Sequence, residues 1–249
     1  MRIFWTLLRR ELASFFFSLT GYVIIAAVTL IVGSSFVMLI RNMGTDPFSM
    51  PVTELFFNSQ MYWLLVILIA PVVTMRLFAL EKATGTLETL MTTPVGDFQV
   101  VAAKFTAAVI FYLLAWLPTF VSLMVVQHFT NLPRLDWGMV GGLYGGIFLS
   151  GCLFLSIGCL ASALTKSQMV AAMISLAAGV VLFILAYMAQ VIPPSTSAQA
   201  DVLFYFNLFK QMEDFTRGVL DTRAVVFYVS ATFLFLFLTL RVVESRRWK

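Results

Sequence analysis

The chain has 249 residues, of which 61% are hydrophobic and only 11% are charged. In a soluble domain, roughly a quarter of all residues are charged. A soluble chain as apolar as this one would expose much of its Leu, Val and Phe to water. The composition therefore excludes a soluble globular protein. The net charge of +4 does not indicate a nucleic-acid partner, because the basic residues lie between apolar runs and not in one patch with aromatic residues.

Six apolar runs approach or exceed the length of about 20 residues that a helix needs to cross a bilayer. They lie near Thr20–Ile40, Met61–Met75 with an aromatic lead-in, Phe105–Gln127, Gly138–Leu164, Met169–Val191 and Ala224–Leu240. The first run is too long for the apolar part of a signal peptide, so we expect it to be retained as a span. The sequence predicts an all-α, polytopic membrane protein with a single transmembrane domain over residues 1–249.

The lysines and arginines predict the orientation, because cytoplasmic loops hold an excess of them. One side of the predicted membrane carries eleven, namely Arg2, Arg9, Arg10, Arg76, Lys82, Lys104, Lys166, Arg241, Arg246, Arg247 and Lys249. The other side carries five, namely Arg41, Arg134, Lys210, Arg217 and Arg223. We therefore expect both termini in the cytoplasm, as an even number of spans requires.

Residues 1–19 predict an amphipathic helix that lies on the cytoplasmic leaflet. At 100° per residue, one face is apolar and is formed by Phe4, Leu7, Leu8, Leu12 and Phe15. Glu11 projects into this apolar face. Its carboxylate either extends to the lipid headgroups or pairs with a cation, since an unpaired acid at an apolar boundary is costly.

The cytoplasmic loop of residues 77–97 predicts a short helix between two longer ones. Gly85 can adopt the left-handed conformation that ends a helix, so the extension of the second span should stop there. Pro94 disfavours helix at the preceding residue and limits the next element to about two turns. Asp97 is then a suitable N-cap for the third span.

The predicted short helix has an apolar stripe of Leu87, Leu90 and Met91, with Glu88 beside it. Two isolated turns are not stable in water, so this stripe must pack against something. Either the membrane surface of the protein itself or a separate partner could cover it.

Glycines four residues apart, Gly138, Gly142 and Gly146, give the fourth span a small face for close helix packing. They do not form a phosphate-binding loop, because no Gly-Lys-Ser/Thr follows them. Ser150 and His128 lack the surroundings of a catalytic site, and no metal-ligand spacing occurs in the sequence. We therefore expect no catalytic, cofactor or metal site in this chain.

The external loop of residues 192–223 predicts a second amphipathic helix, on the outer leaflet. Its apolar residues repeat at helical spacing and are Phe204, Leu208, Met212, Phe215 and Val219. The helix could anchor in the headgroup layer or contact a partner.

Taken together, these segments resemble the type-2 ATP-binding-cassette (ABC) permeases. The resemblance rests on the Arg9-Arg10-Glu11-Leu12 start, the six spans and the loop from Glu81 to Val95. Within that group, the external segment Phe215–Arg223 and the ending Glu244–Trp248 look like the gliding-motility permease subfamily.

The resemblance implies a role that composition alone does not. In this family the short helix after Gly85 is the coupling helix, which binds in a groove of a cytoplasmic ATPase. The residues so assigned to ATPase coupling are Glu81, Gly85, Thr86, Leu87, Glu88, Leu90, Met91 and Pro94. ATP and magnesium would bind in the partner ATPase, so this chain would be neither an enzyme nor a cofactor-binding protein.

The same resemblance implies the partners and the location. We expect two copies of the ATPase, a second permease copy or paralogue, the lipid bilayer of a bacterial inner membrane and, as in some members, an auxiliary extracytoplasmic protein. The leading functional hypothesis is a permease subunit that exports an unidentified substrate. The alternative is a mechanochemical subunit that transmits ATPase motion to an extracytoplasmic partner without transport.

Overall fold

The computed structural model describes residues 2–43, 60–86, 96–129, 136–191 and 206–245, and this part of the chain contains helices and no strands. The helices are α1 (Arg2–Phe16), α2 (Leu19–Met43), α4 (Gln60–Thr74), α5 (Ala79–Thr84), α7 (Asp97–Ala115), α8 (Leu117–Phe129), α9 (Trp137–Leu164), α10 (Gln168–Val191), α12 (Leu208–Thr216) and α13 (Thr222–Glu244). The predicted all-α fold class is confirmed.

Within the described residues, six segments are long and apolar enough to cross a membrane, as the sequence predicts. They are Leu19–Met38, Met61–Thr84, Asp97–Val125, Trp137–Leu164, Gln168–Val191 and Thr222–Glu244. The second and the third differ most from the expected bounds. The second extends beyond Met75 to Thr84, and the third begins at Asp97 rather than Phe105, so that Lys104 lies inside it.

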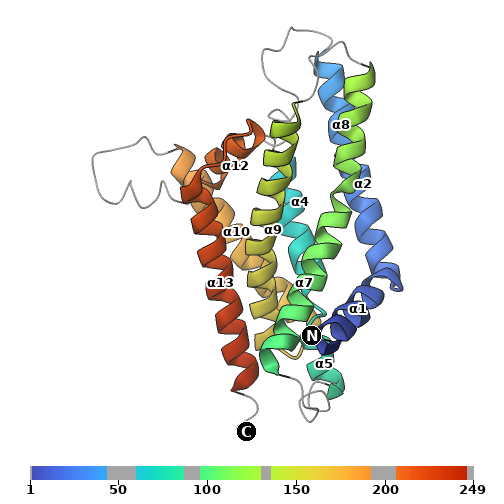
Figure 1. Ribbon diagram of the computed structural model, residues 1–249, viewed down its shortest axis with the longest axis vertical. Helices are drawn as coiled ribbons and strands as arrows, with labels where there is room; N and C mark the ends of the chain where they lie inside the picture. The colour runs from blue at the N-terminus through green and yellow to red at the C-terminus, as the bar shows by residue number, and fades with distance from the viewer. Residues whose placement is uncertain (1, 44–59, 87–95, 130–135, 192–205, 246–249) are drawn as a thin grey trace, which may run out of the picture.

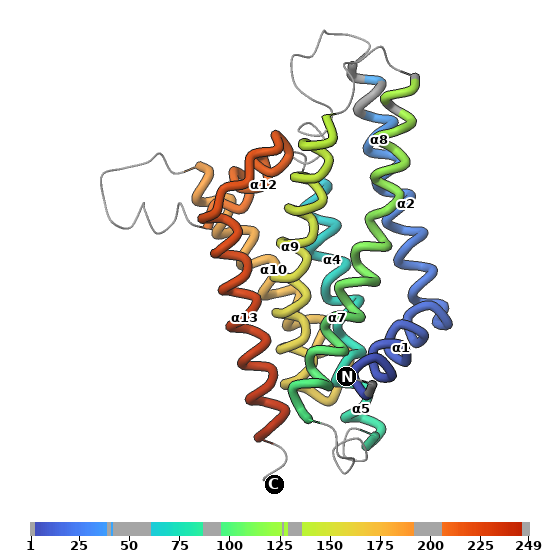
Figure 2. Tube along the Cα trace, in the orientation of Figure 1, coloured from blue at the N-terminus to red at the C-terminus, as the bar shows by residue number. Residues whose placement is uncertain are grey.

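The long helices run side by side along the long axis of the molecule, as Figure 1 shows. The central helix is α9, which packs against α13, α10, α4, α7 and α12. At one end of the bundle, α1 crosses the others obliquely near α5, and α13 ends there too (Figures 1 and 2). The short helix α12 lies at the opposite end.

Polar caps fix the starts of three helices at this opposite end. The Asp136 carboxylate accepts a hydrogen bond from the Gly138 N–H at 2.9 Å at the start of α9. The Asn207 and Asp221 side chains do the same at the starts of α12 and α13. Each cap satisfies a backbone N–H that the first turn of a helix leaves without an intrahelical acceptor.

The third span is divided at Trp116, between α7 and α8. Pro118 explains the break, because it has no N–H to donate to the preceding turn. The Trp116 carbonyl instead accepts hydrogen bonds from the Thr119 N–H at 3.1 Å and from the Tyr144 hydroxyl at 3.2 Å. By contrast, Pro71 is accommodated inside α4.

The external amphipathic segment forms α12, but its apolar face packs against protein. Leu208, Met212 and Phe215 are buried, and α12 lies against α9 and α10. Phe204 falls outside the described residues, and Val219 is exposed beyond the end of the helix. The sequence left open whether this face anchors in the headgroup layer or contacts a partner. In the structure it packs on helices of the same chain, and the glycines of α9 explain why.

Gly142 and Gly146 let α12 approach α9 closely. A Cβ at Gly142 would overlap the carbonyl oxygen of Phe215, and a Cβ at Gly146 would lie 2.7 Å from the Met212 sulfur. Gly138 is the third residue of this stripe and lies opposite Gly218. The glycine stripe therefore receives a helix of the same chain, and this contact buries the apolar face of α12.

Candidate functional site

The short helix α5 is fixed to α9 by Ser162. Both the Phe78 and Ala79 N–H groups donate to the Ser162 hydroxyl at 3.1 Å, and this hydroxyl donates to the Met75 carbonyl at 3.2 Å. The N-cap residue of α5, Phe78, has no side chain that can cap the helix, so a serine from another helix supplies the acceptor. The Lys82 ammonium donates to the Ala163 carbonyl and adds a second attachment to α9.

Gly85 ends α5 in the left-handed conformation, with φ 73° and ψ −1°, as the sequence predicts. This conformation is unfavourable for residues with a Cβ atom, particularly β-branched ones. Thr86 follows, and its hydroxyl lies 2.9 Å from the Thr84 hydroxyl. At the far end of the loop, α7 begins at Asp97, and its N-cap is Gly96 rather than the predicted Asp97.

The remaining residues assigned to ATPase coupling, Leu87, Glu88, Leu90, Met91 and Pro94, lie outside the described residues. The structure therefore places only Glu81, Gly85 and Thr86 of that set. Glu81 lies in α5 and Gly85 ends it, and α5 lies at the end of the bundle where α1 crosses (Figure 1).

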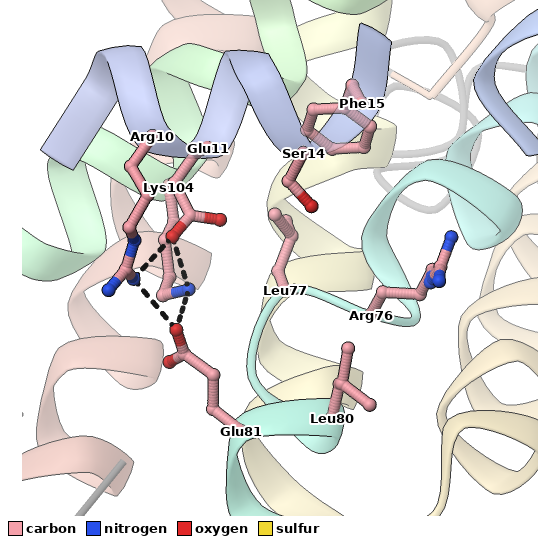
Figure 3. A pocket seen from close by; sticks show the side chains of 9 residues that line it. All are labelled: Arg10, Glu11, Ser14, Phe15, Arg76, Leu77, Leu80, Glu81 and Lys104. Carbon is pink, nitrogen blue, oxygen red and sulfur yellow. Dashed lines mark hydrogen bonds and ion pairs between the residues drawn. The ribbon is translucent and has the colours of Figure 1, made fainter. Parts of the chain in front are cut away.

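Two acids and two bases form a closed cluster between α1, α5 and α7 (Figure 3). We call Arg10, Glu11, Glu81 and Lys104 the charge ring. The Lys104 Nζ lies 3.0 Å from Glu11 Oε1 and 2.9 Å from Glu81 Oε1. The Arg10 Nη2 lies 2.7 Å and 2.9 Å from the same two oxygens. Each cation thus contacts both carboxylates, and the formal charges sum to zero.

The two cations differ in burial. The Lys104 side chain is 2% exposed, whereas the Arg10 side chain is 51% exposed. Water screens a half-exposed ion pair strongly and a buried one much less. Lys104 also lies 5.6 Å from the centre of the Phe78 ring, within range of a cation–π contact.

Partial burial of Arg10 lowers the pKa of its guanidinium, but the hydrogen bonds and charges of Glu11 and Glu81 outweigh burial and raise this pKa above its ordinary value. Arg10 therefore stays charged. For Glu11, the structure provides a cation partner on another helix, which is the second of the two interpretations that its sequence position allows.

A pocket of about 250 Å³ adjoins the charge ring. Apart from the ring residues, it is lined by Ser14, Phe15, Arg76, Leu77 and Leu80. The apolar side chains face each other across the space between α1 and α5 in Figure 3. The Arg76 guanidinium, at the edge, donates to the Thr20 hydroxyl at 2.6 Å and ties the α4–α5 turn to the start of α2.

Sequence reasoning missed the role of Lys104, which it counted only as one of the basic residues on the cytoplasmic side. A signal was present, because Lys104 follows Val100-Val101-Ala102-Ala103 and precedes Phe105. A lysine with apolar residues on both sides along a helix needs a counter-charge. The same reasoning applied to Glu11, and the two residues are partners.

The four side chains of the charge ring pair with one another, so the ring connects α1, α5 and α7. A family model described as ABC-2 family transporter protein matches residues 9–186, which include every residue of the charge ring and the whole loop of residues 77–97. No curated protein sequence matches the chain significantly.

Proposed function

Because the chain belongs to the ABC-2 family of transporter proteins, we propose that it is the permease subunit of an ABC exporter and couples ATP hydrolysis by a separate ATPase to the movement of its six spans. The observation that carries this proposal is the family match over residues 9–186, in a chain whose described residues include six segments long and apolar enough to cross a membrane. The segments Phe215–Arg223 and Glu244–Trp248 favour the gliding-motility subfamily.

In the proposed mechanism, the loop after α5 binds the ATPase, and ATP and magnesium bind in that partner. ATP binding closes the ATPase pair, and the loop moves with it. The attachments of α5 to α9 through Ser162 and Lys82 support the next step, in which the motion passes to the central helix of the bundle. The residues that bind the ATPase are Leu87, Leu90 and Met91 on the apolar stripe, with Glu88 at its rim and Gly85 and Pro94 at its ends.

The assembly that follows from this proposal contains two ATPases and two permease chains, either identical or paralogous. Its location is the inner membrane of a bacterium, with α1, α5 and the end of α13 on the cytoplasmic side. The clustering of these three elements at one end of the bundle supports that orientation (Figure 2). An auxiliary extracytoplasmic protein would act at the end where α12 lies.

The orientation predicts opposite accessibility for two exposed positions. A cysteine replacing Leu220, beyond α12, should react with a membrane-impermeant maleimide in intact cells. A cysteine replacing Lys166, between α9 and α10, should react only after permeabilisation. The native Cys152 and Cys159 are buried and give little background. Labelling of the Lys166 variant in intact cells, without labelling of the Leu220 variant, would reverse the orientation.

The permease assignment predicts that the purified chain hydrolyses no ATP by itself and co-purifies with the ATPase encoded beside it. The complex should hydrolyse ATP in liposomes and move a substrate when the correct one is supplied. ATP turnover by the isolated chain, free of contaminating ATPases, would contradict the assignment. Hydrolysis that responds to an extracytoplasmic protein and to no transported compound would favour the mechanochemical alternative.

A further inference from the structure

The charge ring joins helices that are otherwise held by different parts of the bundle. The helix α1 packs on α7 and α2, whereas α5 packs on α9 and α10. Between α1 and α5 lies the pocket of about 250 Å³. Beside this space, the Glu81–Arg10 ion pair bridges α5 to α1, and the Glu81–Lys104 ion pair bridges α5 to α7 (Figure 3).

Lys104 is the stronger of the two bridging cations. It is almost fully buried and contacts one carboxylate from α1 and one from α5. Arg10 contacts the same oxygens, but half of its side chain is in solvent. Loss of Lys104 would leave two carboxylates that share one screened cation, and their repulsion would push α5 away from α1.

The position of α5 matters because the loop of residues 86–95 begins at its end. The backbone turns into that loop at Gly85, one helical turn after Glu81. The attachments to Ser162 and Ala163 fix α5 to α9 on one side, and the charge ring fixes it to α1 and α7 on the other. The helix α5 is therefore connected to two groups of helices at once.

We propose that Lys104 is a positioning residue, which holds α5 against α1 and thereby sets how motion of the ATPase-binding loop reaches the first and third spans. The part that concerns the ATPase rests on the proposed function. The part that concerns the position of α5 does not, so the two are tested separately.

The first test measures the spacing of α1 and α5 in the chain alone. Cysteines replace Ser14 and Leu80, which face the pocket from the two helices, in a background where Cys152 and Cys159 are replaced by alanine. A bifunctional maleimide then cross-links the pair in isolated membranes. Lys104→Met should lower the cross-linking yield several-fold, because α5 moves away from α1, and Lys104→Arg should preserve the wild-type yield.

Two further variants separate the charge ring from a general defect. The double variant Lys104→Met/Glu81→Gln removes one charge of each sign, so its yield should return towards that of the wild type. Arg241→Met is the matched control, because it removes an exposed ion pair with Glu244 on α13, and it should leave the yield unchanged. If Lys104→Met does not insert into the membrane, insertion and cross-linking of the double variant decide the matter.

The second test uses the complete complex with its ATPase. Lys104→Met should keep the wild-type ratio of ATPase to permease while its ATP turnover in liposomes falls several-fold, and Lys104→Arg should restore that turnover. A Lys104→Met variant with wild-type cross-linking and turnover overturns the proposal, as does a double variant that shows no recovery. Failure to find any ATPase partner would leave the first test intact and would count against the proposed function alone.

Discussion

An aspartate in place of Leu87 should abolish co-purification of the ATPase with the permease. In the proposed mechanism, Leu87 belongs to the apolar stripe that binds the ATPase groove. A carboxylate buried there without a counter-charge costs several kcal/mol, on the order of 3–5 kcal/mol for an uncompensated buried charge, which is enough to dissociate a typical subunit contact. The measurement is the ratio of ATPase to permease after affinity purification, once membrane insertion has been verified.

Two other substitutions in the same loop provide comparisons for the effect of Leu87→Asp. Glu88→Arg alters the charged rim of the contact and should weaken it much less, since an exposed ion pair contributes about 0–1 kcal/mol. Gly85→Val forces a β-branched residue into the left-handed conformation and should impair coupling by misdirecting the loop. If Leu87→Asp inserts normally and retains its ATPase at wild-type stoichiometry, this loop does not bind the partner.

Alanine in place of Gly142 should destabilise the bundle, and alanine in place of the adjacent Gly141 should not. The new Cβ at Gly142 would overlap the Phe215 carbonyl, a backbone atom that no side-chain rotation can move away. Overpacking of this kind typically costs about 1–3 kcal/mol. At Gly141 nothing lies within 4 Å of the new Cβ, so the gain in helix propensity of about 1 kcal/mol should prevail.

The comparison of the two variants is informative because both changes add one methyl group to the same helix. Thermal denaturation of the detergent-solubilised chain should give a lower midpoint for Gly142→Ala and an equal or higher midpoint for Gly141→Ala. Equal midpoints for the two variants would show that α12 does not rest on α9 in the membrane protein.

The spans were predictable because bilayer thickness imposes a length and an apolar composition that are visible in one sequence. The end of α5 was predictable for a similar reason, since Gly85 is a strong local signal. The start of the third span was not predictable in this way. We looked for a run without charged residues, and that run begins only after Lys104. Charge alone cannot tell a lysine in the headgroup layer from one with buried partners on two other helices.

The place of α12 could not be read from its own periodicity. An apolar face at helical spacing fits lipid and protein equally well. What decides between them is Gly142, far away in the sequence, where the absence of a side chain makes room for Phe215. The glycine stripe predicted a close approach, but only the structure identifies the helix that makes it.

The order of the charge ring along the chain has a consequence for synthesis. Domains and helices emerge from the ribosome N-terminus first, so Glu11 and Glu81 are made before Lys104. When the third span is made, both carboxylates that pair with its lysine in the folded chain have already been synthesised. Pairing as the span enters would offset the cost of bringing an ammonium group into an apolar helix bundle, so nascent chains that lack Glu11 and Glu81 should release this span from the translocation machinery more slowly.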